Sequence, residues 1–174
     1  LADWRIETSQ TQRINMFARV GELSYPDQEL RDASTVSLGG GLTQNATGRF
    51  SAVYFTSAFI GADEADGSSV DARRAAERNF AGLQAGVQLS ITSGIRVVNR
   101  ISLVTSRYDE ATALTSGDRK RDDDLVLLSS KLVWLINESF SVIGTLRYSN
   151  NQSNIDALEY DGFSGDVRVR YDLN

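Results

Sequence analysis

The C-terminal segment of this chain alternates between apolar and polar side chains with a period of two. Along residues 163–173 every odd position is apolar or small. The even positions are all polar or charged: Ser164, Asp166, Arg168, Arg170 and Asp172. Because successive side chains of a β-strand point to opposite faces, this segment predicts a strand with one apolar face and one charged face. Such a strand suits a soluble sandwich, and it also suits the closing strand of an outer-membrane barrel.

The same alternation recurs along the whole sequence and predicts about eight strands. They cover residues 13–25, 33–43, 49–59, 79–90, 95–108, 124–135, 140–150 and 163–173. Each is close to the 9–11 residues that a tilted barrel strand needs to cross a bilayer. The strand at 49–59 is apolar at both its odd and its even positions, and we predict that the odd set, Val53, Phe55 and Phe59, lies on the apolar face.

The predicted connections alternate between short and long. Residues 44–48, 91–94 and 136–139 are tight turns rich in residues that tolerate hairpin geometry. Residues 60–78, 109–123 and 151–161 form longer, polar connections. Short turns at one end and long loops at the other are typical of outer-membrane barrels, in which the turns face the periplasm. We therefore predict an all-β, antiparallel, up-and-down transmembrane β-barrel over residues 13–174, with residues 1–12 as a lead-in or the end of an earlier strand.

The polar positions of the predicted strands carry many cationic side chains. We predict that the following residues line the lumen: Arg19, Arg96, Arg100, Lys131, Arg147, Asp166, Arg168 and Arg170. Four aromatic residues near strand ends are predicted to lie at the membrane interface: Trp134, Phe140, Tyr148 and Phe163. The alternative is a soluble barrel with the apolar side chains inside and the arginines outside. Periodicity alone does not separate these two arrangements, but the loop asymmetry and the terminal strand favour the membrane barrel.

Composition limits the classes of function. The 174 residues carry a formal net charge of −5, which argues against nucleic acid as a partner. No apolar stretch approaches the roughly 18 residues that a membrane-spanning helix requires. The chain has no cysteine, hence no disulfide and no thiolate metal site.

The sequence also argues against catalysis, because it contains no histidine. Histidine is the usual base or relay in barrel enzymes, since its pKa lies near the working pH. We therefore predict no catalytic residues, no cofactor and no metal site. The acidic groups at 63–66 and 122–124 fall in predicted loops or, for residue 124, directly beside one, and we expect them to be solvated or to be bridged by divalent cations to lipopolysaccharide.

The C-terminal third resembles the end of large Gram-negative barrels. The similarity rests on Arg-Asp-Asp-Asp-Leu at 121–125, on Leu-Arg-Tyr-Ser-Asn-Asn-Gln-Ser-Asn-Ile-Asp-Ala-Leu-Glu-Tyr-Asp at 146–161, and on the final alternating strand. This pattern is similar to the membrane part of surface lipoprotein assembly modifiers and of barrel porins associated with exopolysaccharide systems. The resemblance implies more than eight strands, so that this chain is the C-terminal portion of a larger barrel.

Two functions fit these expectations. The first is a porin-like or export barrel for transport or secretion across the bacterial outer membrane, in which an arginine-rich lumen favours anionic or polysaccharide cargo. The second is a structural or accessory barrel without an open pore, which binds a partner through its long loops. The expected partners are outer-membrane lipid, lipopolysaccharide, and other outer-membrane or periplasmic proteins.

Overall fold

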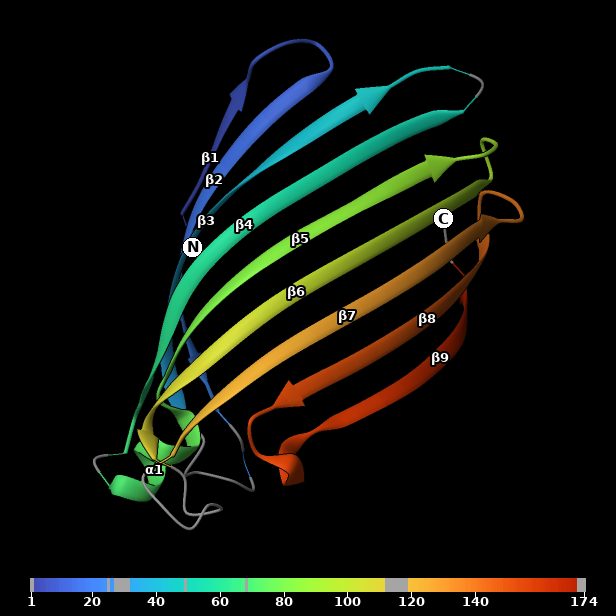
Figure 1. Ribbon diagram of the computed structural model, residues 1–174. Helices are drawn as coiled ribbons and strands as arrows, with labels where there is room; N and C mark the ends of the chain where they lie inside the picture. Colours follow the sequence, from blue (N-terminus) through green and yellow to red (C-terminus); the bar gives the residue numbers. More distant parts are fainter. Residues whose placement is uncertain are drawn as a thin grey trace.

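The computed structural model describes residues 2–24, 26, 32–48, 50–67, 69–111 and 119–171. These residues form one antiparallel sheet in which each strand pairs with the next in the chain (Figure 1). The strands are β1 (Ala2–Glu7), β2 (Gln12–Leu23), β3 (Ala33–Ala46), β4 (Ser51–Ala65), β5 (Arg78–Ser90), β6 (Ile95–Ala111), β7 (Lys120–Leu135), β8 (Phe140–Ser153) and β9 (Tyr160–Tyr171). Two short helices, α1 (Val70–Ala76) and the 3-10 helix η2 (Asp156–Leu158), lie in the β4–β5 and β8–β9 connections.

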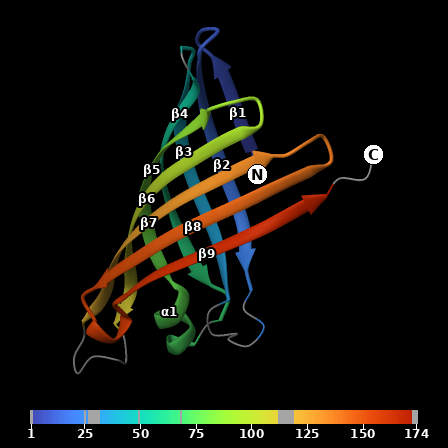
Figure 2. The same ribbon diagram turned by 90° about the vertical axis from the view of Figure 1, so that its right-hand side faces the viewer.

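The predicted all-β antiparallel fold is confirmed, but the strand number and strand lengths differ from the prediction. The described residues form nine strands, because residues 2–7, expected to be a lead-in or the end of an earlier strand, pair with β2 as β1. The sheet is curved and open: β1 and β9 form its two edges (Figure 2). Several strands also run into segments predicted as loops, so that β4 continues to Ala65 and β8 to Ser153. Part of the predicted 109–123 loop lies outside the described residues.

The turns at one end of the sheet are closed by polar side chains. The Thr92 hydroxyl accepts hydrogen bonds from the backbone N–H groups of Gly94 (3.2 Å) and Ile95 (3.0 Å). The Asn137 side-chain carbonyl accepts from those of Ser139 (3.0 Å) and Phe140 (2.8 Å). The predicted tight turns at 91–94 and 136–139 are confirmed, since a side chain satisfies the backbone donors that the turn leaves unpaired.

Pairing register assigns every strand position to one of two faces. Directly paired residues share a face, so the series Leu38, Ile60 and Ala81 lies on one side of β3, β4 and β5. This side, the apolar face, carries exposed residues that include Trp4, Met16, Val20, Leu38, Ile60, Leu83, Leu103, Leu132, Leu146, Phe163, Val167 and Val169. The opposite side, the polar face, carries the arginines described below.

The predicted faces of β4 were wrong. Tyr54 and Ile60 lie on the apolar face, whereas Val53, Phe55 and Phe59 lie on the polar face. The reason is found on the neighbouring strand: Phe55 pairs directly with Gly86, and Phe59 with Gly82. Both rings occupy the space above a glycine, where a Cβ atom would overlap them. An aromatic ring over a cross-strand glycine restores packing that the glycine lacks.

The same pairing occurs twice more on the polar face. Phe17 lies opposite Gly39, and Phe80 lies opposite Gly61. Phe80 also contacts Phe59 edge-to-face, with ring centroids 6.2 Å apart. These rings provide apolar packing on a face whose other side chains are mostly polar.

Helix α1 packs on the polar face at the long-loop end of the sheet. Its N-cap Ser69 accepts a hydrogen bond from the Ala72 N–H at 3.1 Å. Ala72 and Ala76 are buried, and Ala76 lines a small cavity together with Asp63, Arg78 and Tyr108. In Figure 2 the helix lies within the curve of the sheet.

The described residues form almost no hydrophobic core. The buried apolar residues are few and mainly small: Ala33, Ala52, Ala72, Ala76, Tyr108 and Ile155. None of the large side chains described is fully buried. A sheet normally buries its apolar face against a second layer, and this sheet leaves that face uncovered. No helix in the described part of the chain is long and apolar enough to cross a membrane.

The ring-over-glycine packing predicts a large cost for a small substitution. Gly61→Ala places a Cβ atom into the Phe80 ring and the Val36 carbonyl, so we expect a loss of about 1–3 kcal/mol of unfolding free energy. Gly144→Ala is the matched control, because nothing lies within 4 Å of a Cβ there, and its effect should stay within about 0.5 kcal/mol. Urea unfolding of refolded protein measures both. Equal midpoints for the two variants would contradict this account of the packing.

Candidate functional site

The polar face brings together seven of the eight residues predicted to line a lumen. Arg100, Ser129 and Arg147 form one row of directly paired positions across β6, β7 and β8. Thr145 pairs directly with both Lys131 and Asp166, so these residues lie in the next row. Arg96 and Arg168 lie in the row beyond it. Arg170 lies opposite Ser141 at the turn end. Arg19 shares the face but stands apart from this cluster, on β2 opposite Ser37.

The carboxylates of the polar face are paired with arginines. Asp166 contacts Arg168 Nε at 3.0 Å and Arg147 Nη1 at 3.4 Å. The other pairs are Arg5–Asp3 at 3.2 Å, Arg13–Glu7 at 3.0 Å, Arg78–Asp63 at 2.7 Å, and Arg121–Asp123.

Four cations of the polar face have no carboxylate at ion-pairing distance among the described residues. They are Arg19, Arg96, Arg100 and Lys131. The middle of this face is therefore positive, although the chain as a whole carries a net charge of −5. Charge of one sign on one surface raises the local concentration of counter-ions.

A second polar network crosses β4 to β8 at the long-loop end of the polar face. Arg78 donates to Asp63, whose side chain is only 4% exposed, and its guanidinium lies 6.0 Å from the centre of the buried Tyr108 ring. Arg121 stacks on the same ring at 4.3 Å and pairs with Asp123. Ser153 then donates to Asp123 at 2.8 Å. Tyr108 thus lies between two arginines, each neutralised by its own aspartate.

Burial and ion pairing shift the pKa of Arg78 in opposite directions. Desolvation disfavours the charged guanidinium, but the hydrogen bond to the Asp63 carboxylate, with further support from Tyr108, outweighs it, and the pKa of Arg78 is raised above its ordinary value. Arg78 therefore stays cationic at any physiological pH.

The sequence alone did not predict this network, and Asp63 and Asp123 were expected in solvated loops. Both are buried and ion-paired, because β4 and β7 extend past their predicted ends. A sequence signal exists for Asp123, which falls on the same alternate positions of β7 as Ser129 and Lys131. None exists for Asp63, because both alternate sets of β4 are apolar and only the pairing with Arg78 places it.

Contacts with β6 hold helix α1 over this network. Arg73 pairs with Glu110 of β6 at 3.5 Å. The Asp109 N–H donates to the Glu77 carbonyl at 3.3 Å, and the Asn79 side chain donates to the Asp109 carboxylate at 3.0 Å. The β4–β5 connection is thereby held against β6, and it covers part of the polar face at this end.

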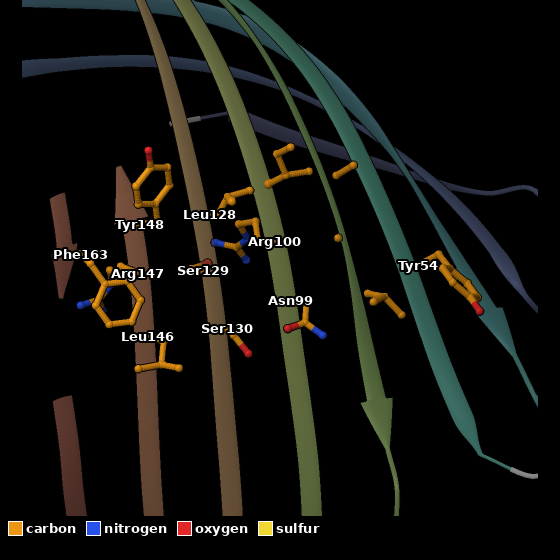
Figure 3. A pocket seen from close by; sticks show the side chains of 14 residues that line it. Tyr54, Asn99, Arg100, Leu128, Ser129, Ser130, Leu146, Arg147, Tyr148 and Phe163 are labelled. Carbon is orange, nitrogen blue, oxygen red and sulfur yellow. The ribbon is translucent and has the colours of Figure 1, made fainter. Parts of the chain in front are cut away.

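All four predicted interface aromatics lie on the apolar face, at two different heights. Trp134 and Phe140 flank the β7–β8 turn, and Phe140 contacts Tyr171 with ring centroids 5.5 Å apart. Tyr148 and Phe163 pair directly on β8 and β9, further from the turns. Figure 3 shows this part of the face, where Tyr54, Leu128, Leu146, Tyr148 and Phe163 line a shallow hollow of about 670 Å³.

Polar side chains border the apolar face at the long-loop end. By register this border includes Glu22, Ser34, Glu64, Asn79, Arg107, Asp122, Asp124, Gln152 and Asp161. The apolar side chains thus form a band with a defined edge.

The described residues contain no group of three or more acidic, histidine or cysteine side chains arranged to hold a metal ion. Comparisons of the chain with models of known protein families, with curated proteins and with solved structures give no match. We therefore infer function from the two faces of the sheet.

The Asp63–Arg78 pair should contribute far more to stability than an exposed pair. Asp63→Asn leaves a largely buried guanidinium without its carboxylate, and we expect a loss of about 2–4 kcal/mol. Asp3→Asn breaks the exposed Arg5–Asp3 pair and should cost less than about 1 kcal/mol. Urea unfolding midpoints give the comparison, and similar losses in the two variants would show that burial does not strengthen the inner pair.

Proposed function

We propose that this chain forms part of the wall of a bacterial outer-membrane β-barrel that acts in transport or secretion. The observation that carries the proposal is the exposed apolar band on one face of the sheet, continuous over nine strands and bordered by polar residues. Exposed apolar surfaces of this extent on a folded chain mark a membrane or a large protein interface. A band that runs without interruption around a curved sheet is best matched by lipid.

The height of the band fits a bilayer. On β9, β8 and β7 the outermost apolar positions are Phe163 and Tyr171, Phe140 and Tyr148, and Val126 and Trp134. Each of these pairs encloses about nine residues, which is the length that a tilted barrel strand uses to cross the hydrocarbon layer. Aromatic residues at the turn end match the girdle that barrels place at the membrane interface.

The strand directions support a lumen wider than that of a small barrel. The described residues form a meander of nine antiparallel strands, in which β1 and β9 run in the same direction, so these edges cannot pair antiparallel with each other. Bacterial single-chain barrels have an even number of antiparallel strands, so closure needs an odd number of further strands. Membrane-embedded edges cannot remain unpaired. A barrel of ten or more strands exceeds the eight-stranded size whose interior side chains just fill.

A structural or accessory barrel remains the second candidate, and one observation favours it. Helix α1 and the Asp63–Arg78–Tyr108–Arg121–Asp123 network cover the polar face at the long-loop end. Conductance across planar bilayers separates the two functions, since only the transport barrel passes ions. The resemblance to surface lipoprotein assembly modifiers and exopolysaccharide-associated porins stays a prediction, as do the expected contacts with lipopolysaccharide.

Two neighbouring residues of β5 test the membrane assignment. Ala85 lies mid-band on the apolar face, and Gln84 lies on the polar face. Ala85→Arg should cost about 2–4 kcal/mol for folding into liposomes, because the charge enters hydrocarbon. Gln84→Arg should cost less than about 1 kcal/mol, because its charge stays in water.

Ala85→Leu is the control for side-chain size and should fold into liposomes like the unchanged protein. Folding yields can be followed by the gel shift between folded and unfolded forms. A protein that is monodisperse in water without detergent, or an equal tolerance of arginine at positions 84 and 85, would overturn the membrane proposal.

The proposal also fixes an orientation, with the long connections outside the cell and the short turns in the periplasm. Single cysteines can report it without background, because the chain contains no cysteine. We expect a membrane-impermeant maleimide to label Ala157→Cys, in η2, on intact cells and to label Ser93→Cys, in the β5–β6 turn, only after the outer membrane is opened. Labelling of Ser93→Cys alone on intact cells would reverse the orientation.

A further inference from the structure

Three arginines of the polar face stack on phenylalanine rings. The Cζ atom of Arg19 lies 4.4 Å from the centre of the Phe17 ring, that of Arg78 lies 5.5 Å from Phe80, and that of Arg100 lies 5.3 Å from Phe55. Each of these rings lies over a directly paired glycine, at positions 39, 61 and 86 respectively. The same three-part unit of glycine, phenylalanine and arginine thus occurs on β2–β3 and twice on β4–β6.

The unit holds the guanidinium group over an aromatic ring. The glycine leaves room for the ring to lie over the neighbouring strand, and the ring attracts the flat face of the cation. A guanidinium that is stacked by its face keeps the N–H groups along its edge available as donors. These donors form a fork that matches two oxygen atoms of a carboxylate or phosphate.

One of the three units is already occupied, and it shows what such an arginine binds. Arg78 donates through Nε to the Asp63 carboxylate at 2.7 Å and through Nη1 to the Ser106 hydroxyl at 3.5 Å. Its ligands are therefore a carboxylate and a serine. Among the described residues neither Arg19 nor Arg100 has a carboxylate at ion-pairing distance.

Arg100 has a phenylalanine ring and a neighbouring serine, as Arg78 has, but no aspartate partner among the described residues. Ser129 pairs directly with Arg100, and Arg147 pairs directly with Ser129 on the other side. Two strand spacings, or roughly 10 Å, separate the backbones that carry the two arginines. These residues and Ser102, Ser149 and Ser164 are among those that line a hollow of about 620 Å³ on the polar face. The nearby Asp166 is held by Arg147 and Arg168 and leaves the local charge positive.

We propose that Arg100, held by Phe55 and flanked by Ser129 and Arg147, binds an oxyanion, the carboxylate or phosphate group of a solute at the polar face. This inference rests on the proposed function, because it names the class of cargo that the proposed barrel would carry. Its binding chemistry needs only the folded sheet.

Isothermal titration of the folded chain in detergent tests the site without a bilayer. Inorganic phosphate, acetate and chloride are titrated separately at equal ionic strength. A fork-shaped donor set prefers oxyanions, so phosphate or acetate should bind about fivefold or more tightly than chloride. A merely positive surface binds the three according to charge alone, and acetate and chloride would then be equal.

Three variants separate the effect of the planar guanidinium from the effect of positive charge alone. Arg100→Lys keeps the charge but loses the planar fork, and Phe55→Leu keeps Arg100 but removes its ring; we expect each to lower oxyanion affinity by about three- to tenfold. Lys131→Gln removes an unstacked cation from the same face and should change affinity less than about twofold. A loss in Lys131→Gln as large as that in Arg100→Lys would overturn the site.

The Arg100 Nε–H NMR signal of the unchanged protein gives a reading that does not depend on how the variants fold. It should shift on addition of phosphate or acetate, whichever binds more tightly, and not on addition of chloride; an unmoved signal overturns the proposal. Oxyanion binding by a chain that fails to enter liposomes would contradict the membrane function alone. Entry into liposomes without oxyanion preference would contradict this site alone.

Discussion

The structure depends on one constraint, the register in which its antiparallel strands pair. Because directly paired residues share a face, a period-two pattern in each strand becomes two continuous surfaces only if all registers agree. Here they agree across nine strands, from Trp4 and Met16 at one edge to Val142 and Val169 at the other. A slip of one residue between any two strands would place arginines beside leucines. The exposed apolar band and the cationic face are thus two consequences of one set of registers.

A sheet without a second layer must stabilise its polar face by other means. Four phenylalanine rings over cross-strand glycines supply local apolar packing there, and ion pairs such as Arg78–Asp63 and Arg121–Asp123 neutralise charges where side chains are most buried. The apolar face has no comparable internal partner. The free energy of folding therefore depends on what covers the apolar face, which links folding of the chain to its environment.

The charges are separated in a way that bears on function. Carboxylates on the polar face are each held by arginines, while Arg19, Arg96, Arg100 and Lys131 carry charge without an acidic partner among the described residues. Other acidic residues lie at the long-loop border of the apolar face, for example Glu64 and Asp124. An acidic protein therefore presents a basic surface, and this surface is the one that the proposed barrel turns toward its lumen.

The sequence by itself determined the strands and most of their faces, because side-chain alternation is a local property of extended backbone. It placed Arg100, Arg147, Asp166 and the other predicted lumen residues on one face, and it placed Trp134 and Phe163 on the other. It did not determine the faces of β4, where both positions are apolar and the deciding partners are Gly82 and Gly86 on the next strand. Nor did it reveal the buried pair of Asp63 and Arg78, which forms only because β4 and β5 pair beyond the apolar band. These features were decided by the tertiary structure, since each depends on which residue of a neighbouring strand lies opposite, and no local pattern encodes that.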